Sequence, residues 1–350
     1  MDTNMKIMLD IALLTAASFL AACSLQEHST ANSNNFQVHE NVSNTPFKRI
    51  SSGDMIAYLA RPEQGGDSLL LVIQGSGCDS VFSADDNGEY IASAGQDIIF
   101  ALADNRYSVL IADKPRVTLG DNGSNGGMES CGKDFRQEHS LKNWVTHIDA
   151  VIDMTKQGLP QIADNNIRII GLSEGAVVAA RVASERNDVS HVSFISGFGC
   201  NQIDDMLVVA RRNWVLENPE AKPEELQQGV AESVLKATEN FKRVFSNPTD
   251  TSILIESQTP LFWSTFGMAC PAQDLAQSSS NVFVAFGTAD EQVSADGIDE
   301  IVARRLIEGK ETKVVRVVGG NHILGTKSEG SPYENLIDVF NESLDWMSSN

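Results

Sequence analysis

The stretch at residues 167–180 constrains the fold more than any other part of the chain, because it joins three local patterns in a fixed order. The apolar run at 167–170 is typical of a short buried strand, and the alanine- and valine-rich run after residue 175 is typical of a buried helix. Between them lies the turn Gly171-Leu172-Ser173-Glu174-Gly175. Larger side chains at 171 and 175 would collide in so sharp a turn. We expect the Ser173 hydroxyl to be exposed at the carboxyl end of a strand; the alternative is an ordinary tight turn.

Apolar segments alternate with segments of helical spacing along most of the 350 residues. This alternation predicts an α/β fold with a mostly parallel sheet and helices on both faces. The continuously apolar run at 68–74 marks a central strand that is covered on both sides. The remaining strands are expected at 55–60, 107–112, 167–170, 191–196, 281–286 and 313–318, and helices at 91–104, 141–157, 295–307 and 332–347.

The alternation stops near Asn201 and resumes at Asn281. Residues 201–277 have helical spacing and no buried strand, so we expect a helical cap above the strand ends. The core would then consist of residues 47–200 and 278–350. An aromatic run at 261–266 either lines an apolar pocket under this cap or simply attaches the cap to the core.

The amino terminus has the features of an export signal. An apolar run at 7–22 ends in Leu20-Ala21-Ala22-Cys23 and is too short for a good membrane-spanning helix. These last four residues resemble the lipobox of bacterial lipoproteins, which implies a signal peptide over residues 1–22 and a lipid on Cys23. Ser24 after the cysteine implies retention in the outer membrane. The alternative is a signal peptide with an incidental cysteine.

Residues 23–46 are rich in serine, asparagine and threonine and have little to bury. This composition predicts a flexible tether between the lipid anchor and the folded domain. The domain would lie in the periplasm or outside the cell. The formal net charge of −21 argues against a nucleic-acid partner, because phosphate binding requires a basic surface.

Four cysteines remain after Cys23, and in an oxidising compartment an even number favours disulfide bonds. Three pairings are possible. Cys78 and Cys131 are expected on the same side of the sheet, and Cys200 and Cys270 bracket the helical insertion. We therefore favour Cys78–Cys131 and Cys200–Cys270. A zinc site is disfavoured, because the chain has no Cys-x-x-Cys pattern.

Two loops after predicted strands carry an acid and an imidazole. Asp290 follows the strand at 281–286, and His322 follows the strand at 313–318. Strand ends meet at one edge of a parallel sheet, so we expect both side chains near Ser173. An imidazole takes the proton of a serine hydroxyl, and a carboxylate holds the imidazole in the required tautomer. The sequence therefore predicts a catalytic Ser-His-Asp triad, with Glu291 as the alternative acid.

Acyl transfer also needs two hydrogen-bond donors for the oxyanion that forms. The Glu174 N–H, directly after Ser173, is one candidate. The turn Gln74-Gly75-Ser76-Gly77 after the central strand supplies the second. We expect the Ser76 N–H to act there, with the Gly77 N–H as the alternative.

These motifs resemble those of bacterial α/β-hydrolases, in which the triad follows the chain order Ser, Asp, His. The turns at 75–77 and 171–175 resemble an esterase subset with a Gly-Ser-Gly-Pro oxyanion loop and a Gly-His-Ser-Glu-Gly elbow. The chain departs from this pattern at Gln74, Cys78, Leu172 and Lys114-Pro115-Arg116.

The resemblance implies cleavage of small-molecule carboxylic esters through an acyl-enzyme, without a cofactor. Peptides and thioesters are alternative substrates for the same triad. An inactive hydrolase fold that serves as an envelope binding protein is the alternative of another class. The loop at 120–132 matches a calcium loop only in part, because Gly123 and Gly132 stand where ligands are needed, so we expect no metal.

Overall fold

The computed structural model describes residues 36–63, 66–84, 87–92, 96–121, 128–162, 166–326 and 333–349, and of residues 96 and 97 it describes the backbone alone. The expected signal peptide, Cys23 and most of the expected tether lie outside these ranges. Within them, no helix has the length and apolar character needed to cross a membrane.

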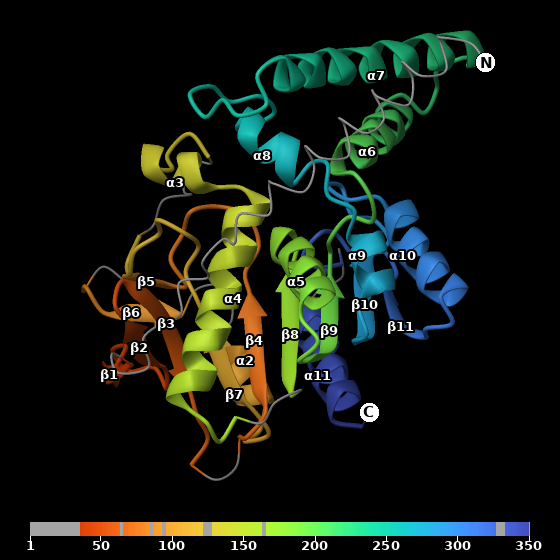
Figure 1. The fold of residues 1–350 in the computed structure, drawn as a ribbon. Helices are drawn as coiled ribbons and strands as arrows, with labels where there is room; N and C mark the ends of the chain where they lie inside the picture. Colours follow the sequence, from red (N-terminus) through yellow and green to blue (C-terminus); the bar gives the residue numbers. More distant parts are fainter. Residues whose placement is uncertain are drawn as a thin grey trace, which may run out of the picture. The chain divides into compact units, whose positions relative to one another are not determined.

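Nine strands of the described chain form one sheet, in the order β1-β2-β3-β7-β4-β8-β9-β10-β11 (Figure 1). Strands β7 to β11 in this order pair in parallel, whereas β1, β2, β3 and β7 pair antiparallel. The sheet is therefore mostly parallel, as the sequence predicts. The strand bounds are β1 Gln37–Asn41, β2 Lys48–Ser52, β3 Met55–Ala60, β4 Leu69–Ile73, β7 Ser108–Ile111, β8 Ile167–Leu172, β9 Val189–Ile195, β10 Asn281–Gly287 and β11 Thr312–Val317, with a separate hairpin of β5 Phe82–Ala84 and β6 Tyr90–Ala92.

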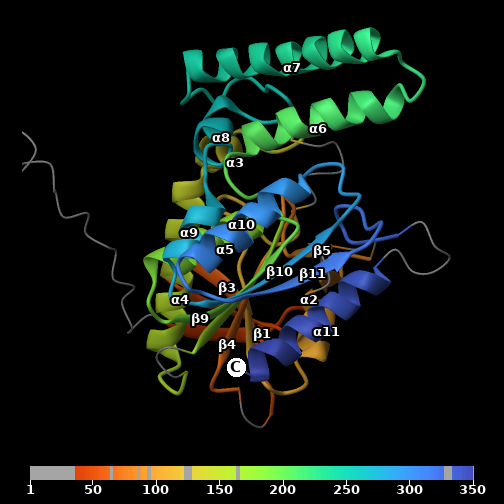
Figure 2. The same ribbon diagram turned by 90° about the vertical axis from the view of Figure 1, so that its right-hand side faces the viewer.

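Helices cover both faces of this sheet. Helices α4, α5, α9 and α10 lie on one face, and α2 and α11 lie on the other (Figures 1 and 2). All five residues of β4 are buried, as expected for a central strand between two helical layers. The helix bounds are α2 Gln96–Leu102, α3 Lys133–Glu138, α4 Leu141–Gly158, α5 Glu174–Glu185, α6 Gln202–Glu217, α7 Pro223–Ser246, α8 Pro260–Thr265, α9 Pro271–Gln277, α10 Ala295–Ile307 and α11 Glu334–Ser349.

Two expectations need correction. Residues 37–41, which we assigned to the tether, form β1 and pair with β2, where His39 Nε2 lies 2.8 Å from Ser51 Oγ. Val42 and Phe47 are buried just after β1 and fix this segment to the core. The helix expected at 91–104 begins only at Gln96, because the residues before it pair with β5 as strand β6.

The helical insertion between β9 and β10 divides into two parts. Helices α6, α7 and α8 lie beyond the carboxyl ends of the parallel strands (Figure 1), whereas α9 packs on α5 and α10 of the core. We call α6, α7 and α8 the cap. The Cys200–Cys270 disulfide joins the two ends of the insertion, and Cys78–Cys131 forms the second disulfide, so the predicted pairing is confirmed.

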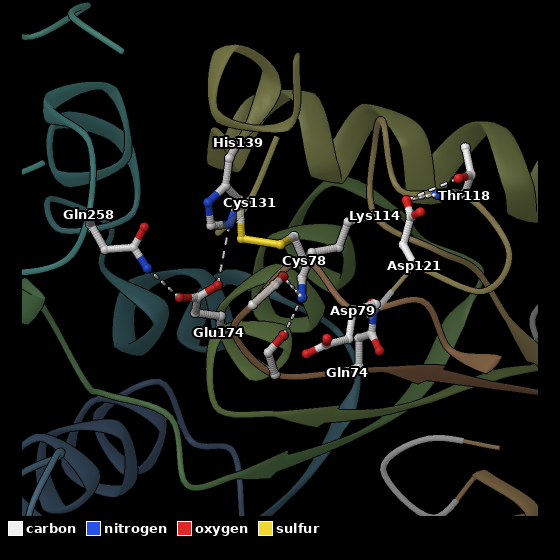
Figure 3. The surroundings of a disulfide bond; sticks show 12 residues. Gln74, Cys78, Asp79, Lys114, Thr118, Asp121, Cys131, His139, Glu174 and Gln258 are labelled. Atoms are coloured by element: carbon white, nitrogen blue, oxygen red, sulfur yellow. Dashed lines mark hydrogen bonds and ion pairs between the residues drawn. A yellow bond between two sulfur atoms is a disulfide. The ribbon is translucent and has the colours of Figure 1, made fainter. Parts of the chain in front are cut away.

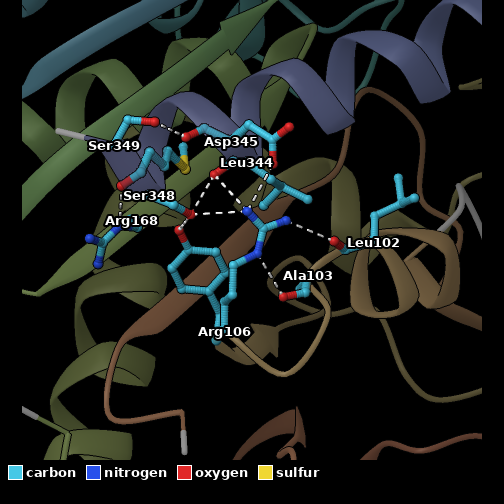
Figure 4. A network of polar contacts seen from close by, with 10 residues as sticks. Leu102, Ala103, Arg106, Arg168, Leu344, Asp345, Ser348 and Ser349 are labelled. Carbon is cyan, nitrogen blue, oxygen red and sulfur yellow. Dashed lines mark hydrogen bonds and ion pairs between the residues drawn. The ribbon is translucent and has the colours of Figure 1, made fainter.

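Arg106, in the segment after α2, contacts the carboxyl-terminal helix α11 (Figure 4). Arg106 Nη1 donates hydrogen bonds to the Leu344 carbonyl, to Asp345 Oδ1 and to Ser348 Oγ. The same guanidinium donates to the carbonyls of Leu102 and Ala103 at the end of α2. Arg106 therefore joins two helices whose side chains reach the site described below.

Candidate active site

The turn between β8 and α5 holds Ser173 in a backbone conformation that residues other than glycine rarely adopt. Its φ is 53° and its ψ is −118°. A Cβ atom on Gly171 would lie 2.5 Å from the Gly175 carbonyl oxygen, and one on Gly175 would lie 2.3 Å from the Ile73 carbonyl oxygen. Glycine is therefore required at both positions, as predicted. Strain of this kind costs about 1–3 kcal/mol and persists only where the surrounding structure enforces it.

The structure brings Ser173, His322 and Asp290 together from three strand ends. Ser173 Oγ lies 3.0 Å from His322 Nε2, and His322 Nδ1 lies 2.9 Å from Asp290 Oδ2. The Asp290 side chain is 4% exposed and the His322 side chain 16%. The other oxygen of Asp290 accepts the N–H groups of Gln292 and Val293 at 2.8 and 3.0 Å. These bonds hold the carboxylate so that Oδ2 faces the imidazole.

The loops that carry Asp290 and His322 are held against each other by their backbones. The Ala289 N–H donates to the Gly320 carbonyl at 2.9 Å. A Cβ on Gly287 would lie 2.2 Å from the same carbonyl oxygen, so only glycine permits this approach. Asn321 Oδ1 accepts the N–H groups of Ile323 and Gly325 and closes the turn around His322. The neighbouring Glu291 is exposed, and Asp290 is the acid that His322 Nδ1 meets.

The predicted oxyanion donors lie beside Ser173. A Cβ on Gly75 would lie 3.4 Å from the Ser173 Cβ, which places this turn in contact with the serine. The Glu174 N–H is the first of α5, and the first N–H groups of a helix have no partner within it. In the described part of the chain, neither the Ser76 N–H nor the Glu174 N–H donates to a protein acceptor. Both remain available to an anion at Ser173.

A buried lysine that sequence reasoning missed holds the turn around Ser76 (Figure 3). Lys114 is 2% exposed, and its Nζ donates to the Gly75 carbonyl at 2.5 Å and to the Gly77 carbonyl at 2.7 Å. The ammonium also lies 4.8 Å from the centre of the Trp144 ring. Burial lowers the pKa of Lys114 to about 8, although Glu174, Asp79 and Asp113 oppose this shift.

Three of the residues that depart from the esterase pattern support this turn. Cys78 is bonded to Cys131, Lys114 binds the carbonyls on either side of Ser76, and Gln74 Nε2 donates to the Asp79 carbonyl at 3.2 Å. A disulfide, an ammonium and an amide therefore support the turn around Ser76.

A second group missed from the sequence is His139, which links α5 to the cap. His139 Nε2 lies 3.3 Å from Glu174 Oε2, and both side chains are buried (Figure 3). The distance is that of an ion pair, but the two atoms are not aligned for a hydrogen bond. Gln258 Nε2 donates to the other Glu174 oxygen at 3.4 Å. The imidazole packs on the rings of Phe135 and Phe262.

An apolar cavity of about 500 Å³ opens on one side of Ser173. His322 lines it together with Leu172 and Ile195 from the sheet and Ile98 from α2. Residues of α11 close it, chiefly Leu336 and Phe340.

A second cavity of about 520 Å³ lies between Ser173 and the cap. Its walls are more polar and come from α6, α7, α8 and the segment just before α8, and they include Gln202, Lys236 and Gln258. The predicted aromatic run serves both expected purposes in part: Phe262 stacks on Phe266 at the base of the cap, and Phe262 and Trp263 also line this cavity.

The partial calcium motif at 120–132 falls mostly on residues 122–127, which lie outside the described part of the chain. Among the residues that are described, no group of three His, Cys, Asp or Glu side chains is placed to hold a metal ion.

No protein-family model and no curated protein matches this sequence. Solved structures do resemble it. The acylaminoacyl peptidase of Pyrococcus horikoshii is 12% identical with a TM-score of 0.54, over 90% of this chain and 41% of the peptidase chain. Est1E from Butyrivibrio proteoclasticus with ferulic acid bound is 15% identical with a TM-score of 0.52, over 89% of this chain and 100% of that chain. At such identities the similarity shows the fold alone: this chain has the α/β-hydrolase fold.

Proposed function

We propose that this protein is a serine hydrolase that cleaves carboxylic esters through an acyl-enzyme. The observation that carries the proposal is the chain of contacts from Ser173 through His322 to Asp290, with distances of 3.0 and 2.9 Å. The strained backbone of Ser173 adds support, since such strain is typical of residues held for function.

Each member of the triad has a defined task. Ser173 Oγ attacks the ester carbonyl carbon while its proton passes to His322 Nε2. Asp290 holds the imidazole tautomer and stabilises the imidazolium. His322 then returns the proton to the alcohol oxygen as the carbon–oxygen bond breaks. In the second half-reaction, a water molecule gives a proton to His322 and attacks the acyl carbon. His322 returns this proton to Ser173 Oγ as the bond between Oγ and the acyl carbon breaks, which releases the carboxylic acid and restores the free enzyme.

The oxyanion that forms in each half-reaction would be held by the N–H groups of Ser76 and Glu174. The positive end of the α5 dipole adds to this stabilisation. Removal of one such donor typically costs about 3–4 kcal/mol of transition-state stabilisation. This expectation supports a catalytic purpose for the buried Lys114, which holds the carbonyls on both sides of Ser76.

The positions of the two cavities suggest how the substrate lies. His322 must reach the leaving group to protonate it, and His322 lines the apolar cavity. The leaving alcohol therefore lies between α2 and α11, and the acyl group lies under the cap. Apolar walls leave the polar groups of a peptide backbone without partners, whereas an apolar alcohol has few groups that need them. This favours esters over peptides.

A fluorophosphonate probe tests the proposal directly. Labelling of the purified domain, and its loss in Ser173→Ala, is the expected result. An unlabelled wild-type protein would instead favour an inactive binding protein. Rates on p-nitrophenyl esters, aminoacyl amides and acyl thioesters then compare the three substrate classes.

The amino-terminal pattern supports a second proposal, on location. The run Leu20-Ala21-Ala22-Cys23 is the basis for a lipid anchor at Cys23, with the domain held at the outer membrane.

A further inference from the structure

The cap-side cavity has a chemical character that the proposed triad does not require. Gln202 Oε1 and Gln258 Oε1 are buried oxygen atoms that accept no hydrogen bond from any described residue. Both side chains line this cavity. Buried acceptors without partners are costly, so two at one cavity point to a ligand that satisfies them.

The orientation of Gln258 is set by its neighbour. Its amide nitrogen donates to Glu174 Oε1 at 3.4 Å, so its oxygen is the atom left without a partner. Glu174 is 7% exposed, and its second oxygen lies 3.3 Å from His139 Nε2 without hydrogen-bond alignment. Glu174 thus faces His139 and the Gln258 amide, and the acceptors left for a ligand are Gln202 Oε1 and Gln258 Oε1, which need donors to pair with them.

The charges around the cavity exclude one class of ligand. Carboxylates of Glu174, Glu256 and Glu291 line it, against the single ammonium of Lys236. An anionic group placed here would meet net repulsion at short range. Phe262 and Trp263 supply apolar surface for the carbon chain of the ligand.

We propose that the cap-side cavity binds an acyl group that carries hydroxyl, amide or ammonium donors and no negative charge. This inference rests on the proposed function, because it treats the cavity as the acyl side of Ser173. It goes beyond that function by stating which acyl groups the enzyme prefers. Gln202 and Gln258 are then residues that determine this preference.

Four p-nitrophenyl esters with one leaving group and chains of equal length provide the test. The acyl groups are heptanoyl, 6-hydroxyhexanoyl, 6-aminohexanoyl and the half-ester of adipic acid. In the wild type we expect kcat/KM for the hydroxyl and ammonium chains to exceed that for heptanoyl by about tenfold, the size of one hydrogen bond to a buried acceptor. The adipate half-ester should be the slowest.

The variants Gln202→Met and Gln258→Met keep the side-chain length but remove an acceptor. Each should reduce the preference for the hydroxyl chain over heptanoyl several-fold. Gln228→Met on the exposed side of α7 is the matched control and should keep the wild-type ratio. Thermal unfolding of all three variants identifies any loss of folding, and because the measured quantity is a ratio within each variant, it does not depend on the active fraction.

The outcomes separate the two proposals. Ser173-dependent hydrolysis of heptanoyl ester without a preference for the donor chains would overturn the acyl-site inference alone. An unchanged ratio in both glutamine variants would overturn it as well. Hydrolysis that survives Ser173→Ala, or no hydrolysis of any of the four esters, would overturn the proposed function and this inference with it.

Discussion

Lys114 Nζ lies 2.5 Å from the carbonyl oxygen of Gly75, in a site where the lysine side chain is almost wholly buried. It also binds the Gly77 carbonyl, so one charge fixes the backbone on both sides of Ser76. We expect Lys114→Met to lower kcat by about 10- to 100-fold, since small displacements of a transition-state donor have effects of this size. KM should change little, because the ester ground state does not depend on this donor.

The control for that substitution is Lys142→Met on α4, where the lysine is exposed. It should behave as wild type. A transition-state analogue such as an alkyl boronic acid should lose affinity for Lys114→Met in proportion to kcat. A variant with normal kcat and normal boronate affinity would contradict a positioning purpose for Lys114.

The pH dependence of the reaction provides a separate test of Lys114. Burial lowers its pKa to about 8, and its charged or titratable neighbours are Glu174, Asp79, Asp113 and, through the backbone of Asp113, His147. The neutral amine forms weaker bonds to carbonyls than the ammonium does. We therefore expect kcat of the wild type to decline as pH rises through about 8, and Lys114→Met to lack this decline.

The contribution of Lys114 to the free energy of unfolding should increase with pH, whereas its contribution to kcat should decrease. The folded-state pKa of Lys114 is below its ordinary value of 10.5, so the unfolded chain binds more protons between about pH 8 and that value. The contribution of Lys114 to the free energy of unfolding therefore increases as pH rises through this window. Denaturant unfolding of wild type and Lys114→Met across the window measures it as a difference. Activity that falls only where stability also falls would indicate simple alkaline unfolding.

Asp290 and Glu291 are adjacent acids, and the structure distinguishes them. Asp290 is buried and faces His322, whereas Glu291 is exposed. We expect Asp290→Asn to reduce kcat by about 10⁴-fold, because the imidazole would be held in the wrong tautomer. Glu291→Gln should keep most of the turnover of p-nitrophenyl acetate. The reverse result would assign the acid to Glu291.

The parts of the site that follow strand ends could be predicted from sequence, and the parts that support them could not. Ser173, Asp290 and His322 each come directly after an apolar run, and parallel strands bring such positions to one edge. Lys114 and His139 carry no local signal of this kind. Lys114 matters because its long side chain passes through the core to two carbonyls, and His139 because it reaches α5 from the segment before α4.

In the fold, too, the elements with a local sequence pattern could be predicted and an element without one could not. The apolar run of β4 and the small residues of α5 are local patterns, and both elements form where they are expected. The segment of β1 has a polar sequence typical of a tether, and all five of its residues are exposed. It is a strand because β2 offers a free edge and because Val42 and Phe47 are buried after it. A single-sequence pattern does not contain that information.

The lipid anchor is tested by one substitution. In a bacterial host, full-length protein should partition into the detergent phase of Triton X-114 and incorporate labelled palmitate. Cys23→Ser should lose both properties, because the Cys23 thiol is the proposed site of lipidation. Ser24→Ala is the control that keeps the cysteine. Labelled palmitate on Cys23→Ser would contradict an anchor at this residue.

The two disulfides should differ in what their removal changes. Cys200–Cys270 closes the ends of an insertion across a sequence separation of 70 residues, and Cys78–Cys131 ties the turn at Ser76 across 53. Loop-closure entropy assigns each up to about 4 kcal/mol of the free energy of unfolding. Mass spectrometry without reduction should find no free thiol in the mature domain.

The paired variant Cys200→Ala/Cys270→Ala should lower stability and alter the acyl-chain preference through the cap. The variant Cys78→Ala/Cys131→Ala should lower kcat as well, since it releases one of the supports of Ser76. Equal effects of both pairs on kcat and on acyl preference would show that the disulfides act only through global stability.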